Sequence, residues 1–437
     1  MLRLAVPVVV VQVGMMLLGV VDTMVVGHLS SEALAAVALG HVGVIAVSSF
    51  SMGFLLALDP LVSQAVGAGD DEAIRRSMQR GLLLAAILMI PSTLLLLPAE
   101  WVFMALHQPP QTVPLAAAYI RICIPGLLPF YGFIVLRQSL QAMERLRPIV
   151  TTIVAVNLFN LVADWALVFG AGPIPQLGPV GSAWATTAAR TLLFVVLVFL
   201  GRRELRPLLE RFDLAVLRPA PLGRIVRLGA PIGFQVQLEI LAFSMVALLM
   251  GLFGALQMAA HQVAINLASL TFMVPLGVGS ATAVRVGQAI GAEDSGGARR
   301  AAVAGLTIGA AFMSVAAAAF LFAPRLLASA YTSAEEVLAL AIVFIPIAGV
   351  FQVFDGLQVV SAGALRGAGD TRAPMLVNIL GFWLIGLPIS AVLSFHFGFG
   401  PEGLWWGVVA GLGSVASFLL ARVAWKFRGD LSRIRVE

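Results

Sequence analysis

The chain has 437 residues, of which 60% are hydrophobic and 11% charged, and its formal net charge is +5. An average soluble domain carries roughly 25% charged residues. The composition therefore excludes a soluble globular protein and predicts an all-α integral membrane protein. The basic residues gather in short loops between apolar runs, which does not indicate a nucleic-acid-binding surface. Cys123 is the one cysteine, so no intramolecular disulfide is possible.

Apolar runs long enough to cross a bilayer follow one another along the chain. A transmembrane helix needs roughly 20 mostly apolar residues, and about twelve such runs occur. Little chain remains for a folded domain outside the membrane. The first run has the length of an uncleaved helix and lacks the features of a signal peptide. The predicted spans lie near residues 4–27, 35–58, 79–101, 116–141, 148–170, 180–201, 226–253, 259–284, 301–323, 337–364, 375–396 and 403–424.

The basic residues predict the orientation of these spans. Lys and Arg accumulate in cytoplasmic loops. Here the loops after even-numbered spans are basic, as at Arg75, Arg76 and Arg80, whereas those after odd-numbered spans hold few basic residues, with Arg325 and Arg121 as exceptions. We therefore expect a multi-pass protein of the cell inner membrane with both termini in the cytoplasm.

The two halves of the chain repeat each other. The segment SQAVGAGDDEAIRR at 63–76 and the segment GQAIGAEDSGGARR at 287–300 share seven of fourteen positions at an offset of 224. Six spans per half is an even number, so both halves have the same membrane orientation. Transporters built from such parallel repeats hold their substrate between the halves. The predicted domains are an N-terminal six-helix lobe over 1–201, a cytoplasmic linker over 202–225, a C-terminal six-helix lobe over 226–424 and a cytoplasmic tail over 425–437.

Four acidic residues, Asp22, Asp164, Glu239 and Asp355, lie inside the predicted spans. A charged side chain at the centre of a bilayer helix costs roughly 2.5–3.5 kcal/mol, so such residues usually mark an ion or substrate pathway. The four do not follow the repeat, since Asp22 falls opposite Val246. We therefore expect a different site in each lobe.

The first predicted site lies on the fifth span, in the run NLFNLVAD. Asn157, Asn160 and Asp164 are spaced i, i+3 and i+7, which places them on one helix face, and Asp22 could join them. Carboxylate and amide oxygens suit a hard cation such as Na+. The carboxylates could instead carry a proton, or Asn160 and Asp164 could only link helices by hydrogen bonds. Three threonines are candidate neighbours: Thr23, Thr186 and Thr187.

The second predicted site combines Glu239 and Asp355 with amides from three spans. We expect these two carboxylates to hold a proton or Na+, although they could also be independent, water-facing groups near helix ends. The amides considered with them are Gln235, Gln262, Asn266, Gln352 and Gln358.

One basic residue, Arg190, lies near the middle of the sixth span, and we expect Asp164 or the Asp22 cluster to pair with it. Three aromatic residues could line an apolar substrate cavity or pack in the core: Tyr131, Phe351 and Phe354. The motifs HExxH and GxSxG do not occur and the histidines are scattered, so we expect neither an enzyme nor a cofactor.

Several long motifs resemble the multidrug and toxic compound extrusion (MATE) family, in particular its NorM-like branch. They are VVDTMVVGHLSSEALAAVALG at 20–40, SQAVGAGDDEAIRR, AAHQVAINLASLTFMVPLGVGSATAVRVGQAIGA at 259–292 and GALRGAGDTRAP at 363–374. The resemblance covers nearly the whole chain. It implies twelve helices in two V-shaped lobes that alternate between outward-facing and inward-facing states.

The resemblance also implies a function. The family exports organic cations and multiple drugs in exchange for Na+ or H+, which makes small organic cations and the bilayer the expected partners of a monomer. By matching motifs, Glu239 and Asp355 would be the coupling carboxylates of the second lobe. Asp22, Asn160 and Asp164 would form the polar site of the first lobe. The alternative is a flippase for a lipid-linked or other amphipathic metabolite. Phosphate recognition would favour a basic cavity, whereas the charge here is mainly acidic.

Overall fold

The computed structural model describes residues 1–171, 175–210 and 213–434. Residues 211–212 of the predicted linker and 435–437 of the predicted tail lie outside this described part. Every regular element within it is a helix. Twelve of the helices, or runs of consecutive helices, are long and apolar enough to cross a membrane. The predicted class, an all-α membrane protein with twelve spans, is confirmed.

The first six spans are formed by eight of the nine helices from α1 to α9, because two of the spans are interrupted and α5 lies outside the spans. One interruption separates α2 from α3. The other is the 3-10 turn η1 (Ile124–Gly126), where Pro125 cannot continue the helical hydrogen-bond pattern. The helices are α1 (Leu2–Gly27), α2 (Ser31–Leu55), α3 (Leu58–Gly67), α4 (Asp71–Leu96), α5 (Ala99–Ala105), α6 (Val113–Cys123), α7 (Leu127–Ala142), α8 (Leu146–Phe169) and α9 (Pro179–Leu200).

The linker and the last six spans follow. The linker holds α10 (Arg202–Leu209) and the 3-10 turn η2 (Leu214–Leu217). The eleventh span contains two π-helical segments, η3 (Ile379–Gly386) and η4 (Val392–His396), on either side of a short α-helix that starts at Leu387. The α-helices are α11 (Pro219–Gly251), α12 (Ala255–Gly291), α13 (Ser295–Phe322), α14 (Pro324–Ser329), α15 (Glu335–Gly367), α16 (Arg372–Asn378), α17 (Leu387–Ala391) and α18 (Pro401–Lys426).

The backbone reproduces the sequence repeat at its turns. Asp70 caps α4 by accepting a hydrogen bond from Ala73 N, and Asp294 caps α13 by accepting one from Gly297 N. These partners are related by the offset of 224. Gly178 and Gly400, which precede α9 and α18, share nearly the same backbone angles, with φ of 58° and 59°. A positive φ favours glycine, so the same residue type recurs at both turns.

The chain divides into two compact units by its contacts. The first unit comprises residues 10–233, and the second comprises residues 1–9 and 234–434. This division differs from the predicted lobes at their first helices, because α1 and α11 each begin in one unit and continue in the other. Within the second unit, the start of α1 packs on α12, where a Cβ added to Gly277 would lie 2.6 Å from Val9 Cγ2.

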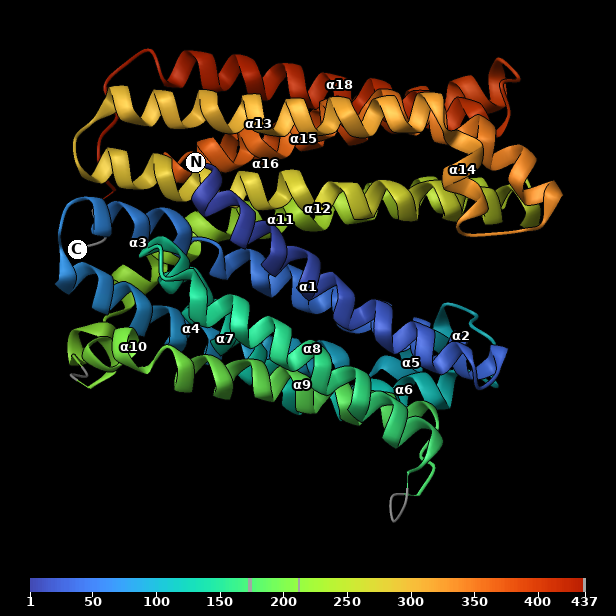
Figure 1. Ribbon diagram of the computed structural model, residues 1–437, viewed down its shortest axis with the longest axis horizontal. Coiled ribbons are helices and arrows are strands. Elements are labelled where there is room, and N and C mark those ends of the chain that lie inside the picture. The colour runs from blue at the N-terminus through green and yellow to red at the C-terminus, as the bar shows by residue number, and fades with distance from the viewer. Residues whose placement is uncertain (172–174, 211–212, 435–437) are drawn as a thin grey trace. The chain divides into compact units, whose positions relative to one another are not determined.

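Each unit has its own hydrophobic core. In the second unit α15 packs against α12, α13 and α18, and these four helices run side by side in Figure 1. Their core centres on Trp405, against which Phe344 and Phe351 pack. In the first unit α8 packs on α9, α7 on α9 and α2 on α6. Tyr119 and Tyr131 are buried there.

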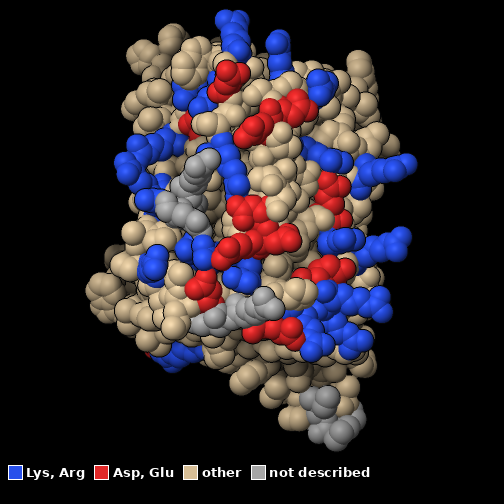
Figure 2. Space-filling view, turned by 90° about the vertical axis from the view of Figure 1, so that its left-hand side faces the viewer, with Lys and Arg blue, Asp and Glu red and all other residues tan. Residues whose placement is uncertain are grey.

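The linker is attached to the first unit by named contacts. Gln79 on α4 donates to the carbonyl oxygen of Leu208 at 2.8 Å, and Arg76 Nε donates to Asp213 Oδ2 at 2.8 Å. Helix α10 and the turn between α3 and α4 lie at the left in Figure 1. Figure 2 shows many Lys and Arg side chains, with Asp and Glu among them, on this end of the helices.

Candidate ion and substrate sites

A buried carboxylate cluster in the first unit joins three helices. Asn160 on α8 donates through Nδ2 to Asp22 Oδ1 on α1 at 3.2 Å and to Asp164 Oδ2 at 3.0 Å. Thr186 on α9 donates to Asp22 Oδ2 at 2.6 Å. All four side chains are buried. The structure therefore brings together Asp22, Asn160 and Asp164, together with Thr186, one of the three threonines considered as neighbours.

The other polar candidates of the first unit have different contacts. Asn157 donates to the backbone oxygens of Gly14 and Ile153, at 3.0 and 2.8 Å, and thereby joins α8 to α1. Thr23 donates to its own helix, and Thr187 donates to the backbone oxygen of Ile122. These side chains thus bond to backbone oxygens of the helices around the carboxylates.

Arg190 does not have the predicted partner. Its Cζ lies 5.2 Å from the centroid of the Phe130 ring, a cation–π contact. Within the described residues it forms no ion pair with Asp164 or Asp22, whose carboxyls accept hydrogen bonds from Asn160 and Thr186. The expectation of an Arg190–carboxylate pair is therefore wrong for this structure.

Tyr131 is a buried residue of the first unit. Its hydroxyl lies 2.9 Å from Ser92 Oγ, which in turn lies 3.0 Å from Ser51 Oγ. This chain of hydroxyls links α7, α4 and α2. Tyr131 therefore holds three helices together in this structure, which fits the alternative of a core residue that the sequence left open.

The candidate site of the second unit centres on Glu239 of α11. Its Oε2 accepts hydrogen bonds from Gln358 Nε2 at 3.2 Å and from Asn378 Nδ2 at 3.3 Å. These two amides come from α15 and α16, so three helices meet at one half-buried carboxylate. Asp355, one turn from Gln358 on α15, is buried and close enough to Glu239 to interact electrostatically. The structure therefore places these two carboxylates in one region of the second unit.

Most other candidates of the second unit lie apart from this pair. Gln262 donates to Asn266 on the same helix at 3.1 Å. Gln235 makes no hydrogen bond among the described residues. Phe351 stacks on Trp405 at 5.8 Å between centroids and is 1% exposed. Phe351 is thus a core residue, one of the two alternatives that the sequence left open, and Phe354 packs against the same core.

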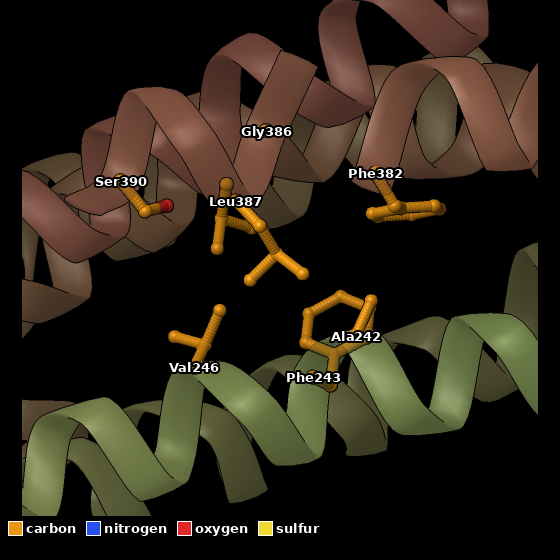
Figure 3. Close-up of a pocket in the computed structure, with 8 residues that line it drawn as sticks. Ala242, Phe243, Val246, Phe382, Gly386, Leu387 and Ser390 are labelled. Carbon is orange, nitrogen blue, oxygen red and sulfur yellow. The ribbon is translucent and has the colours of Figure 1, made fainter. Parts of the chain in front are cut away.

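A narrow apolar pocket lies next to Glu239. Ala242, Phe243 and Val246 follow Glu239 on the same face of α11 and face residues of the eleventh span (Figure 3). Phe243 and Phe382 close one side, with ring centroids 5.9 Å apart. The pocket therefore places an apolar surface one helical turn from a carboxylate. The remaining lining residues are Gly386, Leu387, Ser390 and Val408.

The Asp22–Asp164 cluster and the Glu239–Asp355 cluster resemble each other in the charges and polar atoms that surround them. None of the four carboxylates forms an ion pair with a basic side chain within the described residues. Several amide oxygens beside them are buried and accept no hydrogen bond there: Asn160 Oδ1, Gln352 Oε1, Gln358 Oε1 and Asn378 Oδ1. Buried polar atoms are normally satisfied, and carboxylate and amide oxygens together suit a hard cation. Nowhere in the described chain do three or more His, Cys, Asp or Glu converge, so such an ion would also need amide or hydroxyl oxygens.

Asn378 is a site residue that sequence reasoning missed. It lies in the run LVNIL near the start of the eleventh span, where an amide is easily interpreted as a helix-end residue. The available signal was a single amide in an otherwise apolar run. Its contact with Glu239 joins residues 139 positions apart, and such a distance gives no pattern in a single sequence.

Two parallel six-span repeats, each with its own carboxylate cluster inside the spans, define this chain as a membrane transporter. The sequence profile of the MatE family matches residues 7–166 and, a second time, residues 231–392. The chain therefore belongs to the MatE family of multidrug and toxic compound extrusion transporters, and it is not an enzyme.

Individual proteins are similar over almost the whole length. The chain is 37% identical to a probable multidrug resistance protein NorM of Mesorhizobium japonicum, over 96% of this chain and 92% of that one. It is 35% identical to the multidrug resistance protein NorM of Burkholderia vietnamiensis, over 97% and 92%. The crystal structure of the eukaryotic MATE transporter AtDTX14 has a TM-score of 0.88 at 25% identity, covering 98% of this chain and 97% of that one.

Proposed function

We propose that this transporter exports organic cations and multiple drugs from the cytoplasm in exchange for inward movement of Na+ or H+. The observation that carries the proposal is the pair of carboxylate clusters without basic partners, Asp22–Asp164 and Glu239–Asp355. Each is bordered by buried amide oxygens that accept no hydrogen bond within the described residues. Such a cluster attracts a cation or a proton. The relatives named for multidrug resistance support the substrate class.

Exchange follows when one cation lowers the affinity for another. A coupling ion or proton that binds at Glu239 and Asp355 neutralises the charge that attracts a cationic drug, so the drug leaves. An ion can shift a conformational equilibrium only by its difference in affinity between the states. An inside-negative membrane potential adds roughly 2.3 kcal/mol per inward charge per 100 mV. We further propose that the protein is a monomer of the inner membrane. Both termini lie in the cytoplasm in this proposal, because basic residues follow the even-numbered spans.

The test uses purified protein in liposomes loaded with ethidium, under either an imposed Na+ gradient or an imposed pH gradient. We expect efflux with at least one gradient, and a loss of at least about tenfold in Glu239→Gln and in Asp355→Asn. The matched control is Glu402→Gln, which changes an exposed carboxylate of the same unit. Efflux at the wild-type rate in both site variants would refute the assignment of the coupling carboxylates. Absence of efflux under both gradients would refute cation exchange.

A further inference from the structure

Arg190 is a charged, half-buried side chain inside the sixth span, and it forms no ion pair within the described residues. Its contact is with the Phe130 ring, and its Nη1 is buried without an acceptor in the described part of the chain. A buried guanidinium that lacks a carboxylate is costly. The same unit holds Asp164 Oδ1, which is buried and accepts no hydrogen bond there. An unused donor and an unused acceptor therefore coexist in one unit.

Arg190 lies one turn of α9 beyond Thr186, the residue that binds the Asp22 carboxylate. Thr186 and Arg190 are four residues apart on α9, so they lie on one face a helical turn apart. Thr186 donates to Asp22 at 2.6 Å. Tyr119 lies close enough to Asp22 and to Arg190 to interact electrostatically with both. An arginine side chain is long and flexible, so a change of rotamer is enough to move its charge from Phe130 toward Asp22.

Gly126 leaves room beside the arginine stem. A Cβ added at Gly126 would lie 3.4 Å from Arg190 Cδ and 3.3 Å from Thr187 Cα. The turn η1 therefore approaches α9 closely at this point, and Arg190 lies against backbone without a side chain.

We propose that Arg190 is a tethered internal cation that competes with the coupling ion for the Asp22–Asp164 cluster. The inference rests on the proposed cation exchange. When the cluster is empty, the guanidinium pairs with Asp22 and compensates its charge. When an external cation or a proton binds, Arg190 is displaced to Phe130, the position seen in this structure. The guanidinium thus has two alternative positions, and binding of the ion shifts the equilibrium toward the position at Phe130.

The test compares two substitutions that must act in opposite directions. Arg190→Gln removes the competitor, so the concentration of coupling cation for half-maximal efflux should fall. Phe130→Leu removes the alternative position of the guanidinium, so that concentration should rise. We expect this concentration to shift by roughly three- to tenfold in each variant, because each loses one cation–π contact or one competing charge. Arg190→Lys keeps a positive charge and should remain closer to the wild type than Arg190→Gln.

A second measurement does not depend on transport. The melting temperature of the detergent-solubilised protein is followed as Na+ is added or the pH is lowered, since a ligand of the native state stabilises it by mass action. Arg190→Gln should gain more stabilisation than the wild type, because its empty cluster lacks a compensating charge. Equal gains, or half-maximal concentrations that move in the same direction in Arg190→Gln and Phe130→Leu, would overturn the role of Arg190. Absence of cation-driven efflux in the wild type would instead refute the proposed exchange, and the melting experiment would still decide the role of Arg190.

Discussion

At the residue scale, amide side chains determine how the carboxylates are held. Gln358 and Asn378 each use a donor group on Glu239, and their oxygens accept no hydrogen bond within the described residues. An amide in this arrangement orients the carboxylate and offers a further oxygen to an ion. Asn160 does the same between Asp22 and Asp164. The amides are therefore part of each site and not only its surroundings.

Substitution of Asn378 therefore tests the candidate site around Glu239. Asn378→Ala removes one of two donors to Glu239, and a hydrogen bond to a charged group contributes about 1.5–3 kcal/mol. If Na+ is the coupling ion, we expect its concentration for half-maximal efflux to rise roughly tenfold, because the ion also loses the Asn378 amide oxygen as a ligand. The control is Asn266→Ala, because Asn266 bonds only to Gln262 on its own helix. An equal loss in both variants would show that the effect is not specific to Glu239.

At the scale of elements, small residues set how closely the last two spans pack. Helix α18 approaches the eleventh span at Gly403, Gly407 and Gly411, where the nearest atoms are largely backbone or Ser390. The π-helical segments η3 and η4 flank Ser390. Such segments are rare and frequently occur at functional sites, and η3 carries Phe382 of the pocket beside Glu239.

A substitution at Gly407 should separate these spans. A Cβ there would lie 2.0 Å from Ser390 Oγ and 2.3 Å from Ser390 N, so Gly407→Ala forces the backbone apart. Overpacking of this kind costs about 1–3 kcal/mol. We expect a lower melting temperature in detergent. Gly413→Ala, on the same helix, is the control because nothing lies within 4 Å of its Cβ. A melting temperature equal to that of the control would contradict the packing argument.

At the scale of the whole molecule, the linker between the repeats is a docked segment. It is attached to α4 through Arg76 and Gln79. The Ala215 backbone N–H and the Arg76 guanidinium hold the pKa of Asp213 below its usual range. A lowered pKa in the folded state means that the contribution of Asp213 is present above the ordinary pKa. That contribution is lost as the pH falls through the lowered value.

The linker should therefore respond to loss of this charge. Asp213→Asn keeps an acceptor for Ala215 N but removes the ion pair with Arg76. We expect faster hydrogen exchange in the linker at neutral pH, and little further change on acidification. The wild-type linker should be protected at neutral pH and lose protection only below about pH 4, the ordinary range of aspartate. Glu210→Gln, at an exposed pair with Arg206, serves as the control. Unchanged hydrogen exchange in Asp213→Asn would show that the ion pair between Asp213 and Arg76 does not hold the linker on α4.

The orientation of the spans can be tested with single cysteines. Cys123 is fully buried, so the native chain should react little with a membrane-impermeant maleimide. Ala292→Cys follows the eighth span and Gln111→Cys follows the third, and both positions are exposed. We expect Gln111→Cys to label in intact cells and Ala292→Cys only after permeabilisation. The reverse result would invert the proposed topology.

Much of the architecture can be derived from linear patterns in the sequence. Spans appear as apolar runs, and the repeat appears as shared residues at a constant offset, since both depend on neighbours along the chain. The four acidic candidates were found because a charge in an apolar span is costly wherever its helix packs. The pairing of Asn160 with Asp164 followed from the 3.6-residue period of one helix.

Tertiary structure decided which helices meet. The contact between Glu239 and Asn378, the position of Arg190 over Phe130 and the inclusion of residues 1–9 in the second unit join parts far apart in the sequence. These features depend on how each helix is rotated and packed. Each span is apolar on most of its surface, because lipid and protein neighbours are both apolar. Hydrophobic periodicity therefore does not show which face meets another helix, and the partners of the polar residues emerge only from the packed structure.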